Sequence, residues 1–298
     1  MNAKKHQPLI SVIMPVYNAG NFLIEAIESI LDQTYQNLEF IIIDDGSTDN
    51  SWEIIKNYSE KDKRIRAFKN SKNLGVSTTA NFAINKARGQ FIARMDADDI
   101  SFFDRLEKQV RFLAKNPDII AVGGQCVVID EKNKVIGDKI FPINPKKLRE
   151  MIFWSIPIQQ PSIMINRSLL PKNFNWYFPA CTSAEEVNLL FKLMKYGKIT
   201  NLKDWLLFYR YSPDSLSHKN PKKTFWLTLK SRIGAAKSGF TPTPKALALN
   251  LSQIIIIALL PSKTINNLWH FLRGISREKT KIPEFAKNKT LGELTILR

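Results

Sequence analysis

The first hundred residues alternate between short apolar runs and segments whose apolar residues recur at helical spacing. Leu9–Pro15 forms the first apolar run. In the segment that follows it, the apolar residues fall on one stripe of a helix: Leu23, Ile27, Ile30 and Leu31. A strand of a parallel sheet is apolar throughout because helices cover both of its faces. The pattern therefore predicts a βα repeat that builds a mostly parallel sheet.

The repeat continues through three more predicted strands, at Phe40–Ile43, Ile65–Phe68 and Gln90–Met95. Between them lie two segments of helical periodicity, the first carrying Trp52, Ile55 and Tyr58 and the second Val76, Ala80, Ala83, Ile84 and Ala87. Beyond residue 100 the strict alternation is lost. There the pattern predicts helices at Arg105–Lys115 and Ser183–Met194 and an extended segment at Ile119–Ile129.

Three polar turns follow three of the predicted strands. They are Tyr17-Asn18, Asp44-Asp45 and the segment from Asp96 to Asp99. In open parallel sheets, ligands bind beyond the carboxyl ends of the strands. We therefore expect these three turns to lie close together at one edge of the sheet.

The last of these turns places three aspartates, Asp96, Asp98 and Asp99, within four residues. Such carboxylates repel one another, so the fold must supply a counter-charge, most simply a divalent cation. Oxygen ligands favour magnesium or manganese. His6, His218 and His270 show no paired metal-ligand spacing, which argues against zinc. An isolated segment of this kind is more often a turn that caps a helix, so its meaning depends on the rest of the chain.

The charge of the chain is concentrated near its end. The formal net charge is +17, of which residues 219–298 carry +12 and residues 1–218 only +5. A basic tail fits nucleic acid or an anionic membrane surface, and charge alone does not choose between them.

Cysteine usage and the first residues bear on the compartment. Cys126 and Cys181 lie far apart and form no metal-binding or disulfide pattern. Met1–Gln7 lacks the apolar core of a signal peptide. We therefore expect a reducing, cytoplasmic setting.

Several segments, taken together and in order, resemble the family 2 glycosyltransferases, which are inverting enzymes with the GT-A fold. The resemblance covers roughly residues 8–218. It rests on SVIMPVYNAGNFLIEAIESILDQTY, FIIIDDGSTDNS, NLGVSTTANFAINKARGQFIARMDADD, PIQQPSIM, AEEVNLL and YRYSPDSLSH. It implies an α/β fold with a Rossmann-like, mostly parallel sheet flanked by helices.

The resemblance also implies roles for residues of the three turns. Pro15, Tyr17 and Asp45 would line the pocket for the donor's base, and Asp96 and Asp98 would contact the donor nucleotide. Asp98 and Asp99 would hold Mg2+ or Mn2+ against the diphosphate. The cation would stabilise the negative charge that develops on the leaving diphosphate.

Inverting transfer also needs a general base that accepts the proton of the attacking hydroxyl. Glu185-Glu186 stands where the family usually has Glu-Asp, and the resemblance implies that Glu186 is this base. An isolated pair of acids in a first helical turn is more often explained by the helix dipole. Gln160 stands where many relatives have histidine, so no acceptor role is carried over to it.

Three further residues are candidates of lower rank. Arg94, just before the aspartates, is expected to pair with them or with phosphate. Arg210 and His218 are candidates to contact the diphosphate from a loop, although structural roles fit both equally.

The tail is expected to be a separate unit. We predict a catalytic domain at 1–218 and a basic, partly amphipathic helical extension at 219–298. The apolar run at 246–260 spans fifteen residues, fewer than the ~20 of a membrane span. Aromatic and basic neighbours such as Trp226, Trp269 and Phe271 suit a membrane interface, and the same residues suit packing on the catalytic domain.

The predicted function is transfer of a sugar from a nucleotide-diphosphate donor, a UDP-sugar, to a hydroxyl of a carbohydrate or lipid-linked acceptor. The expected setting is cell-surface polysaccharide or glycolipid assembly, peripheral at the inner face of the cell membrane. A nucleotidyltransferase is the alternative enzyme, but no Gly-rich phosphate loop is present, and a dehydrogenase would need GxGxxG after the first strand. A non-catalytic nucleic-acid-binding protein is the alternative from another class, and no nucleic-acid partner is expected.

Overall fold

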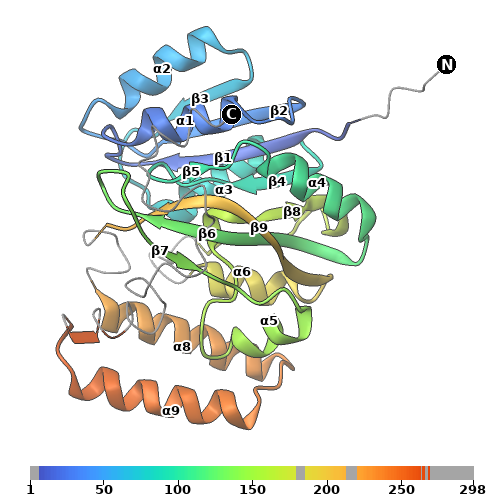
Figure 1. Cartoon of the computed structure of the whole chain (residues 1–298), viewed down its shortest axis with the longest axis vertical. Helices are drawn as coiled ribbons and strands as arrows, with labels where there is room; N and C mark the ends of the chain where they lie inside the picture. The colour runs from blue at the N-terminus through green and yellow to red at the C-terminus, as the bar shows by residue number, and fades with distance from the viewer. Residues whose placement is uncertain (1–6, 179–184, 213–219, 263, 266–267, 269–298) are drawn as a thin grey trace.

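The computed structural model describes residues 7–178, 185–212, 220–262, 264, 265 and 268. Across these residues runs a nine-stranded sheet with the order β3-β2-β1-β4-β8-β6-β9-β5, and β7 pairs with β6 outside this path (Figure 1). The strands are β1 Ile10–Val16, β2 Leu38–Asp44, β3 Ile65–Lys69, β4 Phe91–Arg94, β5 Ile100–Ser101, β6 Ile119–Ile129, β7 Val135–Lys139, β8 Met164–Asn166 and β9 Lys198–Arg210.

The predicted βα repeat is confirmed in the first hundred residues. β3, β2, β1 and β4 are parallel neighbours, and the helices between them are α1 Leu23–Leu31, α2 Ser51–Lys61 and α3 Val76–Lys86. The next predicted helix and strand are also present, as α4 Arg105–Lys115 and β6.

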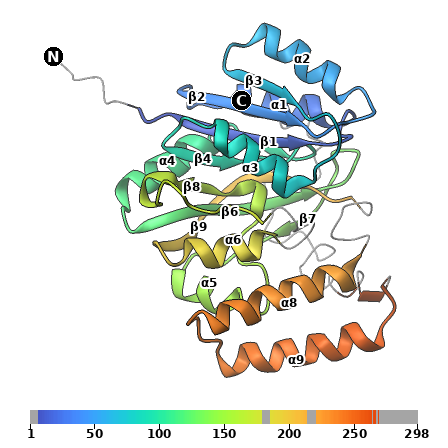
Figure 2. The ribbon, with the colours of Figure 1, turned by 180° about the vertical axis from the view of Figure 1, so that it is seen from behind.

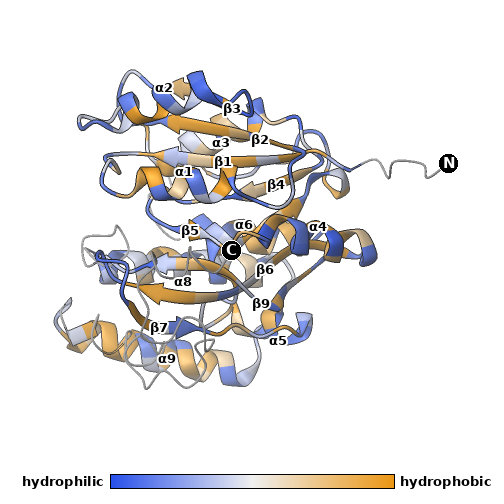
Figure 3. Cartoon of the chain, turned by 45° about the horizontal axis from the view of Figure 1, so that its top comes forward, coloured by the Kyte–Doolittle hydropathy of each residue, from blue (hydrophilic) through white to orange (hydrophobic). Residues whose placement is uncertain are grey.

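Helices cover both faces of the sheet, as the continuous apolar strands require. Val12 and Met14 of β1 belong to the apolar core beneath α1, α2 and α4, whereas Ile13 faces the core beneath α3 and α6 Glu185–Leu193. Figure 2 shows α3 and α6 on the rear face, and Figure 3 shows the apolar strands between the two helical layers. The strand ends are therefore held by a rigid, two-sided core.

The second half of the sheet contains elements that periodicity did not predict: β5, β7, β8, β9 and α5 Pro145–Met151. β9 runs parallel to β6, and the register between them shifts near Gly123 and Gln125. A Cβ atom on Gly124 would lie 2.5 Å from the Leu206 side chain, so glycine lets β9 approach β6 closely. This strand carries the chain back to the aspartates that follow β4.

Two helices near the C-terminus pack against the α5 and α6 side of the molecule. They are α8 Pro221–Lys237 and α9 Pro244–Leu259, which lie side by side in Figures 1 and 2. Arg232 of α8 donates from Nε to the carbonyl of Ile152 at 3.0 Å, and Gln253 of α9 donates to the carbonyl of Trp154 at 2.9 Å. Within the described residues, no helix has the length and hydrophobicity needed to span a membrane.

Candidate functional site

The carboxyl ends of the parallel strands form one edge of the sheet. Val16 at the end of β1 pairs with Asp44 at the end of β2, and β4 pairs with β1 on its other side. The first two polar turns are joined directly, because Asn18 donates its backbone N–H to Ser47 Oγ at 3.0 Å and accepts from the Thr48 N–H at 2.9 Å. The expected meeting of these two turns is confirmed.

The third turn lies on the far side of β1. Met95, which follows β4, donates its backbone N–H to the carbonyl of Ile13 at 3.0 Å. The loop from Asp96 to Asp99 therefore begins at the same sheet edge as the other turns. β1 separates it from Asp45.

Asp45 organises the loop that follows β3. Its Oδ1 accepts from Asn70 Nδ2 at 2.7 Å and from the Leu74 N–H at 3.0 Å, and its Oδ2 accepts from the Gly75 N–H at 2.9 Å. The side chain is buried, so most of its acceptor capacity is used inside the protein. Among the described residues, Oδ1 accepts two hydrogen bonds and Oδ2 accepts one.

Gly46 lets this turn approach the neighbouring loop. It has a φ of +75°, and a Cβ atom there would lie 2.6 Å from the carbonyl carbon of Lys72. Both facts require glycine. The turn thereby forms one wall of a hollow of about 550 Å³, lined by Gly46, Ser47, Thr48, Lys69, Asn70 and Ser71.

The two other residues of the expected base pocket lie at the end of β1 and just beyond it, and they do not line this hollow. Tyr17 is 49% exposed, and Pro15 is half-buried at the end of β1. An exposed aromatic ring beside buried polar groups is available to stack on a planar ligand. Asn18, with a φ of +50°, turns the chain immediately after Tyr17.

Arg94 and Asp96 form a tight pair at the start of the aspartate loop. Arg94 donates from Nε to Asp96 Oδ1 at 2.9 Å, and its second terminal nitrogen lies 2.9 Å from the same oxygen. The Arg94 side chain is almost fully buried, while that of Asp96 is 31% exposed. The expected pairing of Arg94 with the aspartates is thus present in the fold.

Arg210 holds the other end of the loop. Its backbone N–H donates to Asp99 Oδ1 at 2.8 Å, and its Nε donates to the carbonyl of Asp98 at 2.8 Å. Its terminal nitrogens donate to Asn133 Oδ1 at 2.6 Å and to Glu25 Oε2 at 2.8 Å. Arg210 is the last residue of β9 and its side chain is fully buried, so it holds the aspartate loop from within the sheet. The sequence predicted a loop position for Arg210, and the structure places it in a strand. His218 lies outside the described residues.

The carboxylates of this loop are crowded. Burial and the neighbouring charge of Asp96 raise the pKa of Asp98 to about 6. Burial and the charges of Asp98 and Asp96 raise the pKa of Asp99 well above its ordinary value. The counter-charge that we assigned to a cation comes in part from Arg94 and Arg210, whose charges lower the pKa of Asp98 but do not offset the effects of burial and of Asp96.

The residues present fit a divalent cation that the donor helps to bind. Among the described residues, no group of three or more carboxylate, histidine or cysteine side chains converges on one point. Mg2+ and Mn2+ commonly take one or two carboxylates together with substrate phosphates. Asp98 is half-buried at the loop's surface, whereas Asp99 is buried with Oδ1 bonded to Arg210. Asp99 Oδ2 is buried without a hydrogen-bond partner, so Asp99 also fits a cation, although its Oδ1 is already bonded to Arg210 and Asp98 is the more accessible of the two.

Glu185 and Glu186 begin α6 and occupy different environments. Glu185 is buried, and burial raises its pKa while the nearby charge of Arg94 lowers it and that of Asp96 raises it. Glu186 is half-buried. Glu185, the lower-ranked candidate from the sequence, thus interacts electrostatically with Arg94 and Asp96. Glu186 is the more accessible of the two glutamates.

Arg105 is a buried residue next to the candidate site that the sequence analysis did not predict. It is fully buried below the aspartate loop, donates to the carbonyl of Arg94 at 2.8 Å and to Gln109 Oε1 at 3.1 Å, and burial lowers its pKa to about 10. Its place in the first turn of an amphipathic helix, one turn before Gln109, gave no signal of burial. Glu25 was missed because its partner Arg210 lies far along the chain.

A known protein family matches the part of the chain that contains most of the candidate site. Residues 11–174 match the family model described as Glycosyl transferase family 2. The matched residues include Pro15, Tyr17, Asp45 and the aspartates from 96 to 99, and they end before Glu185 and Glu186.

Curated relatives carry names of the same kind. An uncharacterized glycosyltransferase of Haemophilus influenzae is 45% identical over 130 residues, which cover 44% of this chain and 52% of that protein. The putative glycosyltransferase EpsE of Bacillus subtilis is 44% identical over 140 residues, which cover 47% of this chain and 50% of EpsE. The chain spans about half the length of these two relatives.

Solved structures share the fold. The mannosyltransferase PcManGT from Pyrobaculum calidifontis, in complex with GDP-Man and Mn2+, has a TM-score of 0.57 at 17% identity, covering 90% of this chain and 86% of that chain. S. aureus TarS 1–349 in complex with UDP has a TM-score of 0.53 at 19% identity, covering 74% and 64%. This likeness confirms the predicted GT-A fold. The family match across residues 11–174 shows that the chain belongs to glycosyl transferase family 2.

Proposed function

We propose that the protein transfers a sugar, with inversion, from a nucleotide-diphosphate donor to an acceptor hydroxyl. The observation that carries the proposal is the polar sheet edge, where the Asp45 turn and the crowded loop from Asp96 to Asp99 flank the end of β1. Solved structures of the same fold bind UDP, UDP-GlcNAc and GDP-Man, which supports a nucleotide-sugar donor. We propose a UDP-sugar.

In this proposal the nucleoside lies along the first two turns. Tyr17 stacks on the base beside Pro15, and Asp45 accepts an N–H of the base through Oδ2. Asp96, held by Arg94, accepts a ribose hydroxyl. These contacts orient the diphosphate toward Asp98.

Asp98 would hold Mg2+ or Mn2+ together with the donor's phosphates, and Asp99 would remain bonded to Arg210 within the protein. When bound, the cation stabilises the charge that develops on the leaving diphosphate. Arg94 and Arg210 hold the loop in place, so little reorganisation is needed as that charge appears.

Glu186 accepts the proton of the acceptor hydroxyl. Its position in the first turn of α6 supports this role, because the neighbouring Glu185 is close enough to Arg94 and Asp96 for their charges to affect its pKa. A general base of this kind contributes about 10²–10⁴-fold to a rate. Glutamate is one methylene longer than the aspartate usual at this position, so the acceptor hydroxyl would lie farther from the helix.

We further propose that the acceptor is a carbohydrate or a lipid-linked sugar in cell-surface polysaccharide or glycolipid assembly, and that the enzyme works at the inner face of the cell membrane. The net charge of +12 on residues 219–298 supports contact with anionic lipid, and we propose residues 1–218 as the catalytic domain that this basic segment extends.

A panel of UDP- and GDP-sugars, assayed for metal-dependent hydrolysis, tests the proposal. The wild-type protein should release the nucleoside diphosphate from at least one donor with Mn2+ and should stop when EDTA is added. Asp98→Asn should be inactive with every donor. Release of pyrophosphate from a nucleoside triphosphate, with no sugar-nucleotide hydrolysis, would instead support the nucleotidyltransferase alternative.

A further inference from the structure

The outward face of α9 is apolar. Leu247, Leu251, Ile255 and Leu259 are 57%, 61%, 51% and 76% exposed. They recur every fourth residue, so they lie in one row along the helix, which we call the α9 ridge. A helix at the surface of a globular protein normally turns its polar residues to the solvent. α9 instead turns this apolar row to the solvent.

Two polar side chains of α9, those of Asn250 and Gln253, point toward the protein. Asn250 donates to the carbonyls of Phe153 and Ala246, and Gln253 donates to the carbonyl of Trp154 at 2.9 Å. Arg232 of α8 also donates to Asn250 Oδ1 at 3.1 Å. Turning α9 to bury its ridge would break these bonds and leave buried carbonyls unpaired. The outward direction of the ridge is therefore fixed by the fold.

The surroundings of the ridge are basic. Across α8 and α9 there are six lysines and arginines and no aspartate or glutamate. Five exposed residues of α8 follow one another at spacings of three and four: Lys223, Trp226, Lys230, Ile233 and Lys237. Lysine next to tryptophan is typical of the membrane interface, where the ring and the ammonium group reach the headgroups.

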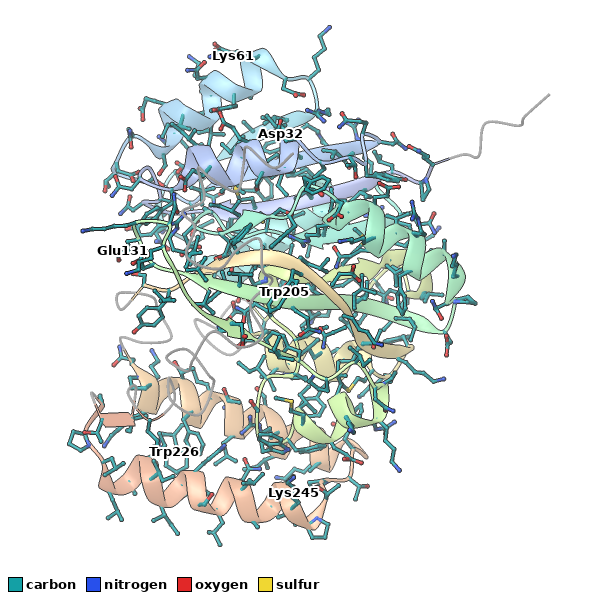
Figure 4. The ribbon with its side chains drawn as sticks, in the orientation of Figure 1. Asp32, Lys61, Glu131, Trp205, Trp226 and Lys245 are labelled. Atoms are coloured by element: carbon teal, nitrogen blue, oxygen red, sulfur yellow. The ribbon has the colours of Figure 1, made fainter. Side chains whose placement is uncertain are left out.

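The two helices form one end of the molecule. Figure 4 labels Trp226 and Lys245 at this end, and side chains of α9 project from it away from the sheet. Figure 3 shows that most of α9 is hydrophobic. A flat partner can thus reach the ridge without approaching the strand edge that holds Asp98.

We infer that the α9 ridge docks onto an anionic lipid surface, with its leucine and isoleucine side chains among the acyl chains and the lysines of α8 and α9 on the lipid phosphates. The ridge covers about 18 Å at 1.5 Å per residue, which suits a helix that lies in the plane of the membrane and does not cross it. A second copy of the chain fits less well, because two α8–α9 pairs would bring like charges together without any acid on either helix.

This inference deepens the proposed function, because it names the surface that brings the active site to a lipid-linked acceptor. It is tested with the full chain and two kinds of vesicle, phosphatidylcholine alone and phosphatidylcholine with about one third phosphatidylglycerol. The protein should co-sediment with the anionic vesicles and far less with the neutral ones. Raising the salt concentration should weaken this binding.

The decisive variant is Leu251→Gln/Ile255→Gln, which should reduce the vesicle affinity by about tenfold or more because it removes two inserting side chains. Ile140→Gln/Ile143→Gln is the matched control, since those isoleucines are 44% and 42% exposed elsewhere on the surface, and it should bind like the wild type. Lys230→Gln/Lys237→Gln should weaken binding to the anionic vesicles only.

Three results would overturn the inference. They are no vesicle binding by the wild type, equal binding by the ridge variant and the control, and a concentration-dependent dimer that the ridge variant abolishes. Donor hydrolysis tests the proposed function independently of vesicle binding. The ridge variant should still hydrolyse the donor in solution, and Asp98→Asn should still bind vesicles.

Discussion

Arg210 and Asp99 join the last strand of the sheet to the aspartate loop: the Arg210 backbone N–H donates to Asp99 Oδ1 at 2.8 Å, across 111 positions of the chain. The Arg210 side chain then bonds to the carbonyl of Asp98 and to Glu25 on α1. The loop is thus held by β9, which lies on the far side of the sheet from β2. This attachment gives the aspartates a fixed position before any ligand arrives.

Asp99 is expected to be structural, so its amide variant should behave differently from that of Asp98. Asp99→Asn keeps an oxygen for the Arg210 N–H and should retain metal-dependent nucleotide binding. Asp99→Ala removes that acceptor and should lower the free energy of unfolding by about 1–3 kcal/mol. Urea unfolding and nucleotide titration measure the two effects. Loss of metal-dependent binding in Asp99→Asn would make Asp99 a metal ligand after all.

The Arg94–Asp96 pair predicts a second stability effect. Arg94→Met leaves Asp96 without its partner while Asp96 stays partly hydrated, so we expect a loss of about 1–3 kcal/mol in unfolding free energy and weaker donor binding. Arg111→Met is the control, because the Arg111–Glu107 pair is exposed and contributes little. Equal stability of the two variants would remove the positioning role from Arg94.

The two glutamates of α6 can be separated by their amide variants. Glu186→Gln should keep donor affinity and lose transfer by about 10²–10⁴-fold, because it removes the proton acceptor and preserves the shape. Glu185→Gln should keep most of the transfer rate and change donor affinity, since the buried Glu185 is coupled to Arg94 and Asp96. Steady-state transfer rates and donor titrations measure both. The opposite result would assign the base to Glu185.

Glu39 at the other end of β2 predicts a pH dependence of stability. Burial alone would raise its pKa, but hydrogen bonds from Ser11 Oγ, the Arg88 N–H and the Arg66 side chain outweigh burial and lower it below 4.5. A lowered folded-state pKa gives stability that is present above pH 4.5 and is lost as the pH falls through the folded-state value.

Glu39→Gln should therefore have a free energy of unfolding about 1–2 kcal/mol lower than the wild type at pH 7. This difference should shrink as the pH falls below the pKa of the Glu39 carboxyl in the unfolded chain. Glu60→Gln is the control, because the Glu60–Lys56 pair is 66% exposed at both side chains. Thermal or urea unfolding between pH 3 and 7 measures how the difference in unfolding free energy changes with pH. A constant gap at all pH values would contradict the assigned pKa direction.

The first half of the fold could be predicted because its strands are apolar throughout and its helices are amphipathic, as in β2 and α1. β9 could not, since Lys203 and Asp204 interrupt its apolar pattern and its position depends on the close approach at Gly124. Only three residues form β8, too few for any periodicity.

The sequence motifs predicted which residues belong to the candidate site, but not how those residues are held in place. The motifs located Asp45 and the aspartates, because each follows a strand that the pattern reveals. They did not reveal that Asp45 bonds to the 70–75 loop, or that the buried Arg105 lies below the aspartates. Such partners come from distant parts of the chain and are fixed only by the packing of the sheet.

The linkage between cation and nucleotide tests the central claim most directly. The dissociation constant of UDP, or of the nucleoside diphosphate of whichever donor is hydrolysed, is measured by calorimetry with Mn2+ and with EDTA, for the wild type and for Asp98→Asn. We predict that Mn2+ tightens nucleotide binding by about tenfold or more in the wild type and has no effect in Asp98→Asn. The same response to Mn2+ in both proteins would contradict the account.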